Sequence, residues 1–178
     1  MQMNNKIGAE INLIKLPLNT KFEFELDQDN TDWVRDILLE LNENASEKSP
    51  EAYLQETSIF IKGNIEKKDR SDMKEFLLVD GLVQVDYVTE CVRTLKPMTM
   101  QLDVPFKICF LDESLAQSDL FVDAEDTFIE NDTYELYFFT KRTVDFREMI
   151  HEQIFLQYEQ YPILDAEAKL EGVDTHEG

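Results

Sequence analysis

The segment Cys91-Val92-Arg93-Thr94 comes closest to a motif with recognisable chemistry. A C-x-x-C pair at a turn between two strands can hold a tetrahedral zinc ion, because both thiolates reach the same metal. Here the second position is Thr94, which is not a zinc ligand, so half of such a site is absent. We therefore expect the chain to bind no metal, and we expect Cys91 to be a small buried side chain.

Two further patterns approach metal-binding motifs without completing them. His151-Glu152 starts an H-E-x-x-H zinc motif, but Phe155 occupies the position of the second histidine. The acidic residues from Asp119 to Glu135 lack the glycine that an EF-hand requires at its sixth position. A glycine-rich phosphate loop is missing, and neither cysteine has a histidine close in sequence. We expect no enzyme, no cofactor and no small-molecule substrate, although catalytic residues converging from distant segments stay an open alternative.

The chain is strongly acidic, with a formal net charge of -21 from 17 Lys+Arg and 38 Asp+Glu. Residues 111–178 contribute -14 of this charge, and residues 111–135 hold nine acids and no base. Such a field repels naked nucleic acid, because affinity for phosphate comes mainly from Lys and Arg. The composition leaves three readings open: acidity for solubility alone, a basic protein partner, or RNA reached through a local basic patch.

Length and cysteine content bound the setting of the protein. A chain of 178 residues is most simply one domain with a sizeable core. With two cysteines and no signal-like N-terminal segment, we expect a reduced, cytoplasmic protein. No apolar run approaches the length of a membrane span, so we expect no membrane partner.

A sheet must position the candidate residues. Apolar residues alternate with polar ones over 83–91 and again over 98–110, which predicts two half-buried strands joined by a tight turn. Their apolar sets share a face only if paired residue numbers sum to an odd value. This register puts Cys91 toward the core and Cys109 on the opposite face, against a disulfide, and it puts Arg93 at the hairpin tip.

The rest of the chain supplies further strands, a loop and an ambiguous glycine. Alternation predicts strands over 20–26, 57–66 and 134–139. The acidic segment 111–135 reads as a solvated loop, whose anchors to the core are Phe121, Val122, Phe128 and Ile129. Asp80-Gly81 is either the two-residue turn of a hairpin or a bulge within one long strand that continues to Cys91.

Two amphipathic helices complete the expected fold. Apolar stripes at helical spacing predict them over about 31–43 and 143–161, and Pro162 ends the second. We expect an α+β fold, in which an antiparallel, partly barrel-like sheet carries these helices. A single domain over residues 1–164 is followed by an acidic tail, 165–178, that we expect to be disordered.

Several of these features occur in a recognisable order over about residues 76–164. They are a strand containing Gly81, then Glu90-Cys91-Val92-Arg93-Thr94-Leu95-Lys96-Pro97, a second strand ending at Phe110, the acidic segment, and a helix with Asp145-Phe146, Glu152, Ile154 and Leu156 before Pro162. This series resembles the family of the large ribosomal RNA subunit accumulation protein YceD, with its E-C-x-R-C-x-x-P and D-L-x-x-x-x-x-E-x-I-x-L patterns. The family's continuous glycine-containing strand favours the bulge at Gly81.

The chain departs from the family pattern at two places. Thr94 replaces the second cysteine of the knuckle, and Ile163-Leu164-Asp165-Ala166 stands where many members carry a cysteine cluster. The resemblance therefore implies a divergent member without the metal, in which Cys91 is the remnant of a lost knuckle.

The resemblance implies a non-enzymatic role in large ribosomal subunit assembly, supporting the accumulation of 23S ribosomal RNA. The expected partner is a large-subunit rRNA precursor or a ribosomal protein. The candidate contact residues are Arg93 and Lys96 at the hairpin tip and Lys67, Lys68 and Arg70 in a charged turn. The alternative is an acidic binding module or chaperone, whose carboxylates in 112–135 hold a basic ribosomal protein.

Overall fold

The structure, a computed structural model, describes residues 7–158. Its centre is a six-stranded sheet in the order β2-β3-β4-β5-β7-β6. The strands are β2 (Lys21–Asp27), β3 (Ser58–Arg70), β4 (Lys74–Glu90), β5 (Pro97–Asp112), β6 (Asp126–Ile129) and β7 (Asp132–Phe139). The expected α+β class is confirmed. The expected partly barrel-like closure is wrong, because the edge strands β2 and β6 do not pair with each other.

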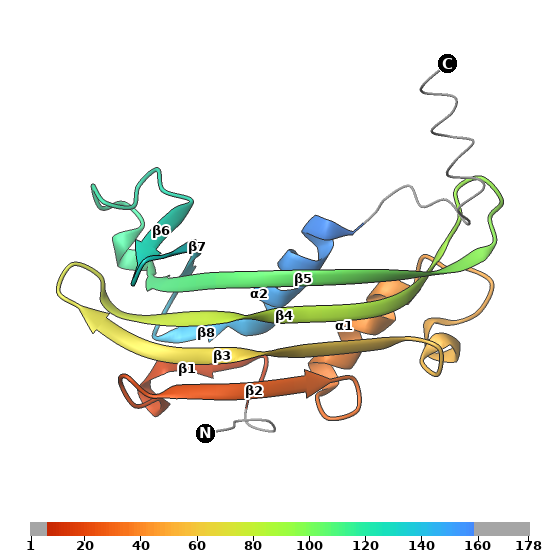
Figure 1. Cartoon of the computed structure of the whole chain (residues 1–178), viewed down its shortest axis with the longest axis horizontal. Coiled ribbons are helices and arrows are strands. Elements are labelled where there is room, and N and C mark those ends of the chain that lie inside the picture. Colours follow the sequence, from red (N-terminus) through yellow and green to blue (C-terminus); the bar gives the residue numbers. More distant parts are fainter. Residues whose placement is uncertain (1–6, 159–178) are drawn as a thin grey trace, which may run out of the picture.

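Two helices, α1 (Asp32–Asn42) and α2 (Phe146–Gln157), pack on one face of the sheet, and the strands pass in front of them in Figure 1. Both predicted helices are present, but the second begins three residues later than expected and ends at Gln157, before Pro162, because the backbone of Tyr158 is extended. The Asp145 carboxylate caps α2 by accepting a bond of 2.9 Å from the Glu148 backbone N–H. Residues 143–145 instead form β8 (Thr143–Asp145), which pairs with β1 (Glu10–Asn12). Residues 159–161 and the predicted tail lie outside the described residues.

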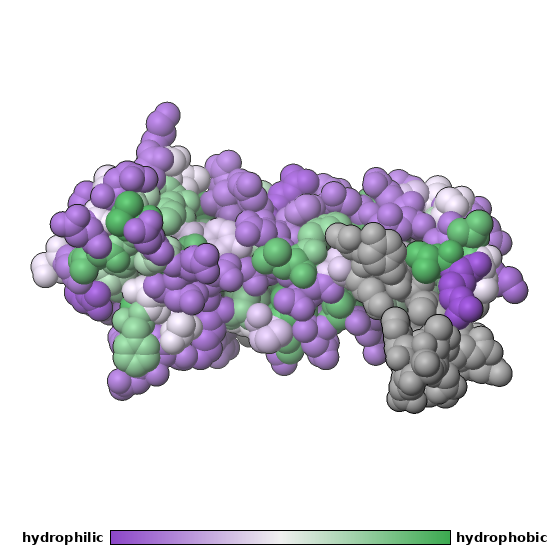
Figure 2. Space-filling model, turned by 90° about the horizontal axis from the view of Figure 1, so that it is seen from above, coloured by the Kyte–Doolittle hydropathy of each residue, from purple (hydrophilic) through white to green (hydrophobic). Residues whose placement is uncertain are grey.

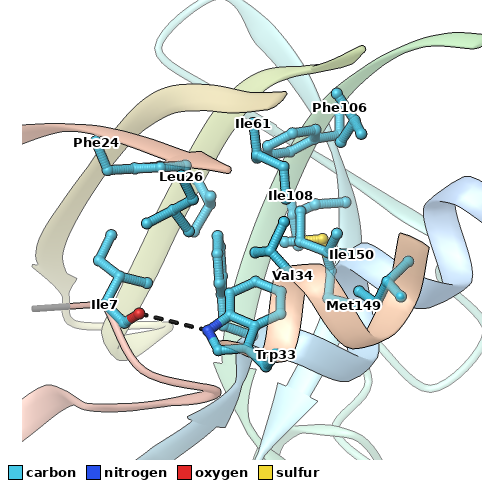
Figure 3. Close-up of a cluster of buried hydrophobic side chains, with 14 of the residues drawn as sticks. Ile7, Phe24, Leu26, Trp33, Val34, Ile61, Phe106, Ile108, Met149 and Ile150 are labelled. Atoms are coloured by element: carbon cyan, nitrogen blue, oxygen red, sulfur yellow. Dashed lines mark hydrogen bonds between the residues drawn. The ribbon is translucent and has the colours of Figure 1, made fainter. Parts of the chain in front are cut away.

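The main core lies between the helices and the sheet (Figure 3). The ring of Phe146 meets the rings of Trp33 and Phe24 edge to face, with centroids 5.7 and 5.5 Å apart. The Trp33 indole N–H donates to the Ile7 carbonyl at 3.5 Å, which ties the start of the described chain to α1. Burial of these rings, each worth roughly 1.5–3 kcal/mol by area, holds the helices on the sheet.

The predicted register of the β4–β5 hairpin is confirmed. Val83 lies opposite Val104 and Tyr87 opposite Met100, so paired numbers have an odd sum. The odd residues of β4 and the even residues of β5 therefore share the helix face, as alternation predicted. Cys91 and Cys109 are both buried and unpaired with each other, and Cys109 belongs to a smaller core on the opposite face.

The preferred reading of one long strand through Gly81 is confirmed, because β4 runs without interruption from Lys74 to Glu90, but the expected bulge and the alternative hairpin turn are both wrong. Gly63, Gly81 and Phe106 lie side by side on β3, β4 and β5, and the pairing is regular on both sides of them. A Cβ on Gly81 would overlap the Lys62 carbonyl oxygen and lie 2.8 Å from the Phe106 ring. Glycine is needed here for close approach of the strands, not for an extra residue.

The smaller core lies on the opposite face of the sheet, and the segment 113–125 lies against it. It consists of Met73, Phe76, Leu78, Cys109, Leu111, Phe121, Ile129 and Tyr134. Of the four expected anchors, Phe121 and Ile129 are buried, whereas Val122 and Phe128 are 48% and 64% exposed. The segment predicted as a loop also holds β6, which a two-residue turn of Glu130 and Asn131, both with positive φ, joins to β7.

Candidate functional site

The hairpin tip, residues Cys91–Lys96, connects β4 to β5. Its backbone is closed by two hydrogen bonds, from the Cys91 N–H to the Lys96 carbonyl at 2.9 Å and from the Leu95 N–H to the Cys91 carbonyl at 2.8 Å. Cys91 is fully buried beneath this turn. The side chains from Val92 to Lys96 are all exposed, so the tip offers a guanidinium and an ammonium to a partner.

Leu95 is a tip residue that the sequence did not identify. Its side chain is 68% exposed, and its φ of 59° is unusual for a residue other than glycine, asparagine or aspartate. An apolar side chain held in this conformation and turned to solvent costs stability. The one available signal was a leucine at a turn position where glycine or asparagine is usual.

The residues around Cys91 do not fit a zinc ion. Thr94 is exposed and its hydroxyl accepts a bond of 3.4 Å from the Lys96 N–H, so it contributes to the turn instead. Cys109 lies far along β5, opposite Leu78. Among residues 7–158, no three His, Cys, Asp or Glu side chains converge as a metal site would require.

His151 has a structural environment. Its Nε2 lies 2.7 Å from a carboxylate oxygen of Glu40, which joins α2 to α1. Its ring stacks on Phe155 with a centroid distance of 4.3 Å. This residue therefore links the two helices across the surface of the core.

The three candidate bases of the charged turn are already engaged. Lys67 is only 6% exposed, and its ammonium donates to the Leu13 carbonyl at 2.9 Å and lies 3.6 Å from a Glu75 carboxylate oxygen. Lys68 forms an ion pair with Glu130. These contacts leave little of the two ammonium groups for a phosphate, because each would have to give up a carboxylate or a buried carbonyl first.

Arg70, the third base, is held within its own turn. Its guanidinium donates two bonds to Asp72, at 2.6 and 2.9 Å. This hydrogen-bonded pair raises the pKa of Arg70 and lowers that of Asp72. The Asp72 carboxylate therefore occupies the two N–H groups with which the Arg70 guanidinium would otherwise bind a phosphate.

The two basic candidates lie at opposite ends of the sheet. The tip follows the end of β4, and Lys67, Lys68 and Arg70 lie beside its beginning (Figure 1). At roughly 3.3 Å per residue, the 17 residues of β4 separate the two groups by about 50 Å. The structure therefore does not bring the five bases together in one patch.

The acidic segment forms the end of the molecule beyond β5. Figure 2 shows apolar side chains exposed among hydrophilic ones at this end, over β6 and β7. Leu120 and Val122 are 61% and 48% exposed, and the nine carboxylates of 111–135 surround them in sequence without a base. Exposed apolar residues rimmed by charge are typical of a protein contact surface.

Comparison with known proteins places the chain in a family. Residues 79–178, more than half of the chain, match the family described as large ribosomal RNA subunit accumulation protein YceD. No curated protein and no solved structure gives a significant match. Neither helix within residues 7–158 is long and apolar enough to cross a membrane. The matched region starts within β4 and includes the whole β4–β5 hairpin tip, so this chain belongs to the YceD family of large ribosomal RNA subunit accumulation proteins.

Proposed function

We propose that this protein is a non-enzymatic, cytoplasmic factor in large ribosomal subunit biogenesis that supports the accumulation of 23S rRNA. Membership of the YceD family supports the pathway. The observation that carries the mechanism is the hairpin tip, where Arg93 and Lys96 stand exposed at a turn that lies four residues of β4 beyond the end of its pairing with β3. A guanidinium and an ammonium at this position can pair with phosphates of an rRNA precursor.

The two basic candidates differ in accessibility, because Arg93 and Lys96 are both exposed whereas Lys67 is only 6% exposed. Lys67, Lys68 and Arg70 are held by Glu75, Glu130 and Asp72. Leu95 adds an apolar surface beside the two cations, and apolar side chains can pack against unstacked bases of RNA. We therefore assign the RNA contact to Arg93, Lys96 and Leu95.

Charge reversal at the tip tests this assignment in cells. Arg93→Glu with Lys96→Glu should abolish co-sedimentation with large-subunit precursors and lower the level of 23S rRNA. The matched control is Lys15→Glu with Arg35→Glu, which changes the same charge at two exposed positions outside the tip. An equal loss in both variants would contradict a specific tip contact.

The second candidate is an acidic binding module, or chaperone, for a basic ribosomal protein. It is favoured by the exposed Leu120 and Val122 within a segment that has nine acids and no base. Neutralising the carboxylates of 112–135 should then abolish recovery of the ribosomal protein and leave rRNA recovery intact. Affinity capture with and without RNase separates the two functions, and recovery of neither rRNA nor ribosomal proteins would contradict both.

A further inference from the structure

Within residues 7–158, no helix covers the face of the sheet opposite α1 and α2 along the middle of β3, β4 and β5 (Figure 1). The register puts Phe60, Leu82 and Pro105 on this open face, since their neighbours along each strand belong to the main core. All three side chains are at least partly accessible. Solvated sheet faces are usually polar throughout. Apolar residues in the centre of this open face therefore indicate a surface that a partner covers.

Three hollows lie on the open face, one at the level of Gln84 and Asp86 on β4 and two side by side across the strands at the level of Asp80, and we call them together the sheet groove. The first has a volume of 440 Å³, the second 310 Å³ and the third 510 Å³. Their lining residues on this face are Ser58, Phe60, Gln84, Asp86, Gln101 and Asp103 in the first, Glu23, Glu25, Lys62, Asn64 and Leu82 in the second, and Pro105 and Lys107 in the third, with Asp80 shared by the second and third.

Two glycines lie side by side in the second hollow. Gly63 and Gly81 form its floor, and they bring β3 and β4 closer than any side chain would permit. The Phe106 ring packs on the far side of Gly81, so the core stays filled while the open face stays hollow. The hollow on the open face therefore lies where the two glycines are aligned, and the core beneath Gly81 is filled by the Phe106 ring.

The charges along the sheet groove are mostly negative. Glu23, Asp80, Asp86 and Asp103 line it, against Lys62 and Lys107. Lys107 forms an ion pair with Asp132, which offsets its charge. A row of carboxylates at this spacing repels a phosphate backbone and attracts cationic side chains.

We propose that the sheet groove binds an extended, lysine- and arginine-rich segment of a partner protein. An extended segment that lies along β4 passes from the first hollow to the other two, because Asp86 and Asp80 lie six residues apart on this strand, about 20 Å. Successive side chains of an extended segment point in opposite directions, so alternate cations reach the carboxylates. The apolar stems of lysine and arginine cover Phe60, Leu82 and Pro105. This site is separate from the hairpin tip and from the acidic segment, and it does not depend on either proposed role.

Peptide binding to the whole chain tests the proposal. The probe is a fluorescent peptide of about eight residues that alternates lysine and threonine, and fluorescence anisotropy at physiological salt measures its affinity. Asp86→Lys with Asp103→Lys should raise the Kd at least about tenfold, because two attractions become repulsions. Both positions are at the surface, and circular dichroism checks that the variant keeps its fold.

The matched control is Asp36→Lys with Glu152→Lys, which makes the same charge change at exposed positions of α1 and α2, on the opposite face of the sheet. This control should change the Kd less than about threefold, since it lies outside the groove. Equal weakening in both variants would overturn the proposal, and so would failure of the peptide to bind the unmodified chain. A single-stranded RNA that displaces the bound peptide from the groove would also overturn it. If Arg93→Glu with Lys96→Glu leaves rRNA co-sedimentation unchanged in cells, this result contradicts only the proposed function. The peptide assay does not involve Arg93 or Lys96, so it tests the sheet groove separately.

Discussion

Replacing Gly81 by alanine probes the closest approach of backbone in the sheet. The added Cβ would overlap the Lys62 carbonyl oxygen on β3 and lie 2.8 Å from the Phe106 Cζ on β5. The ring can shift only within a filled core, and the carbonyl belongs to the backbone of the β3–β4 pair. The substitution must therefore move a strand rather than a flexible side chain.

The expected cost follows from three contributions. Overpacking of a filled core costs about 1–3 kcal/mol. Displacement of a strand weakens its hydrogen bonding, at about 1 kcal/mol for each bond lost. Alanine also lowers the conformational entropy of the unfolded chain, which offsets about 0.4–1 kcal/mol of this cost. We expect Gly81→Ala to lower the free energy of unfolding by about 1–3 kcal/mol, which corresponds to about 3–10 °C in Tm for a chain of this size.

Urea and thermal unfolding followed by circular dichroism measure this cost. Gly8→Ala is the matched control, because its Cβ would meet no atom closer than 3.6 Å and should leave stability within about 0.5 kcal/mol. Combining Gly81→Ala with Phe106→Leu should recover part of the loss, since only the ring contact is relieved. A Gly81→Ala protein as stable as the unmodified chain would refute the close approach of β3 and β4 on which the sheet groove depends.

Three other predictions concern single side chains. Lys67→Met should cost about 1–3 kcal/mol in urea unfolding, because the Leu13 carbonyl loses its charged donor and keeps only the Leu16 N–H. Burial raises the pKa of the Cys109 thiol to about 12, so thiol reagents at pH 8 should not modify it in the folded chain, and stability should fall as the pH rises above the ordinary value of 9.0, where the unfolded thiol ionises first. Leu95→Gly should not lower the free energy of unfolding, because glycine adopts a φ near 59° without strain, whereas it should weaken RNA capture.

The central hairpin and both helices were predictable because each signal is local and repeated. Alternation over the hairpin strands allowed only registers with an odd sum, and the structure has one of them. The apolar stripe of α1 similarly predicted which face is buried, including Trp33, Val34 and Ile37. The position of Arg93 in the turn follows from the same register.

Short elements and side-chain partners were not predictable for physical reasons. β1 and β8 have three residues each, too few for a period to show, and they pair across most of the chain. The role of Lys67 depends on the Leu13 carbonyl, 54 positions away in sequence. The interpretation of 67–72 as an available basic turn used sequence neighbours alone, whereas burial and ion pairing are set by the fold.

The pairing of Gly63 with Gly81 was also not predictable from the sequence. Each glycine alone was compatible with a turn or a bulge, and only their alignment on adjacent strands shows that both serve close approach. The sheet groove was invisible in the sequence for the same reason, because its lining comes from four strands.

The net charge of -21 does not exclude an RNA contact once the charges are placed in space. At physiological salt a surface charge acts over about 8 Å, so the local field at the hairpin tip decides what binds there. The acidic segment and the tip lie at opposite ends of β5. The nearest acid along the chain, Glu90, accepts a bond of 2.6 Å from the Ser46 hydroxyl, which directs it toward the loop after α1. The proposed RNA contact at Arg93 and Lys96 is therefore compatible with a strongly acidic chain, and it is compatible with the proposed binding of a basic protein segment in the sheet groove.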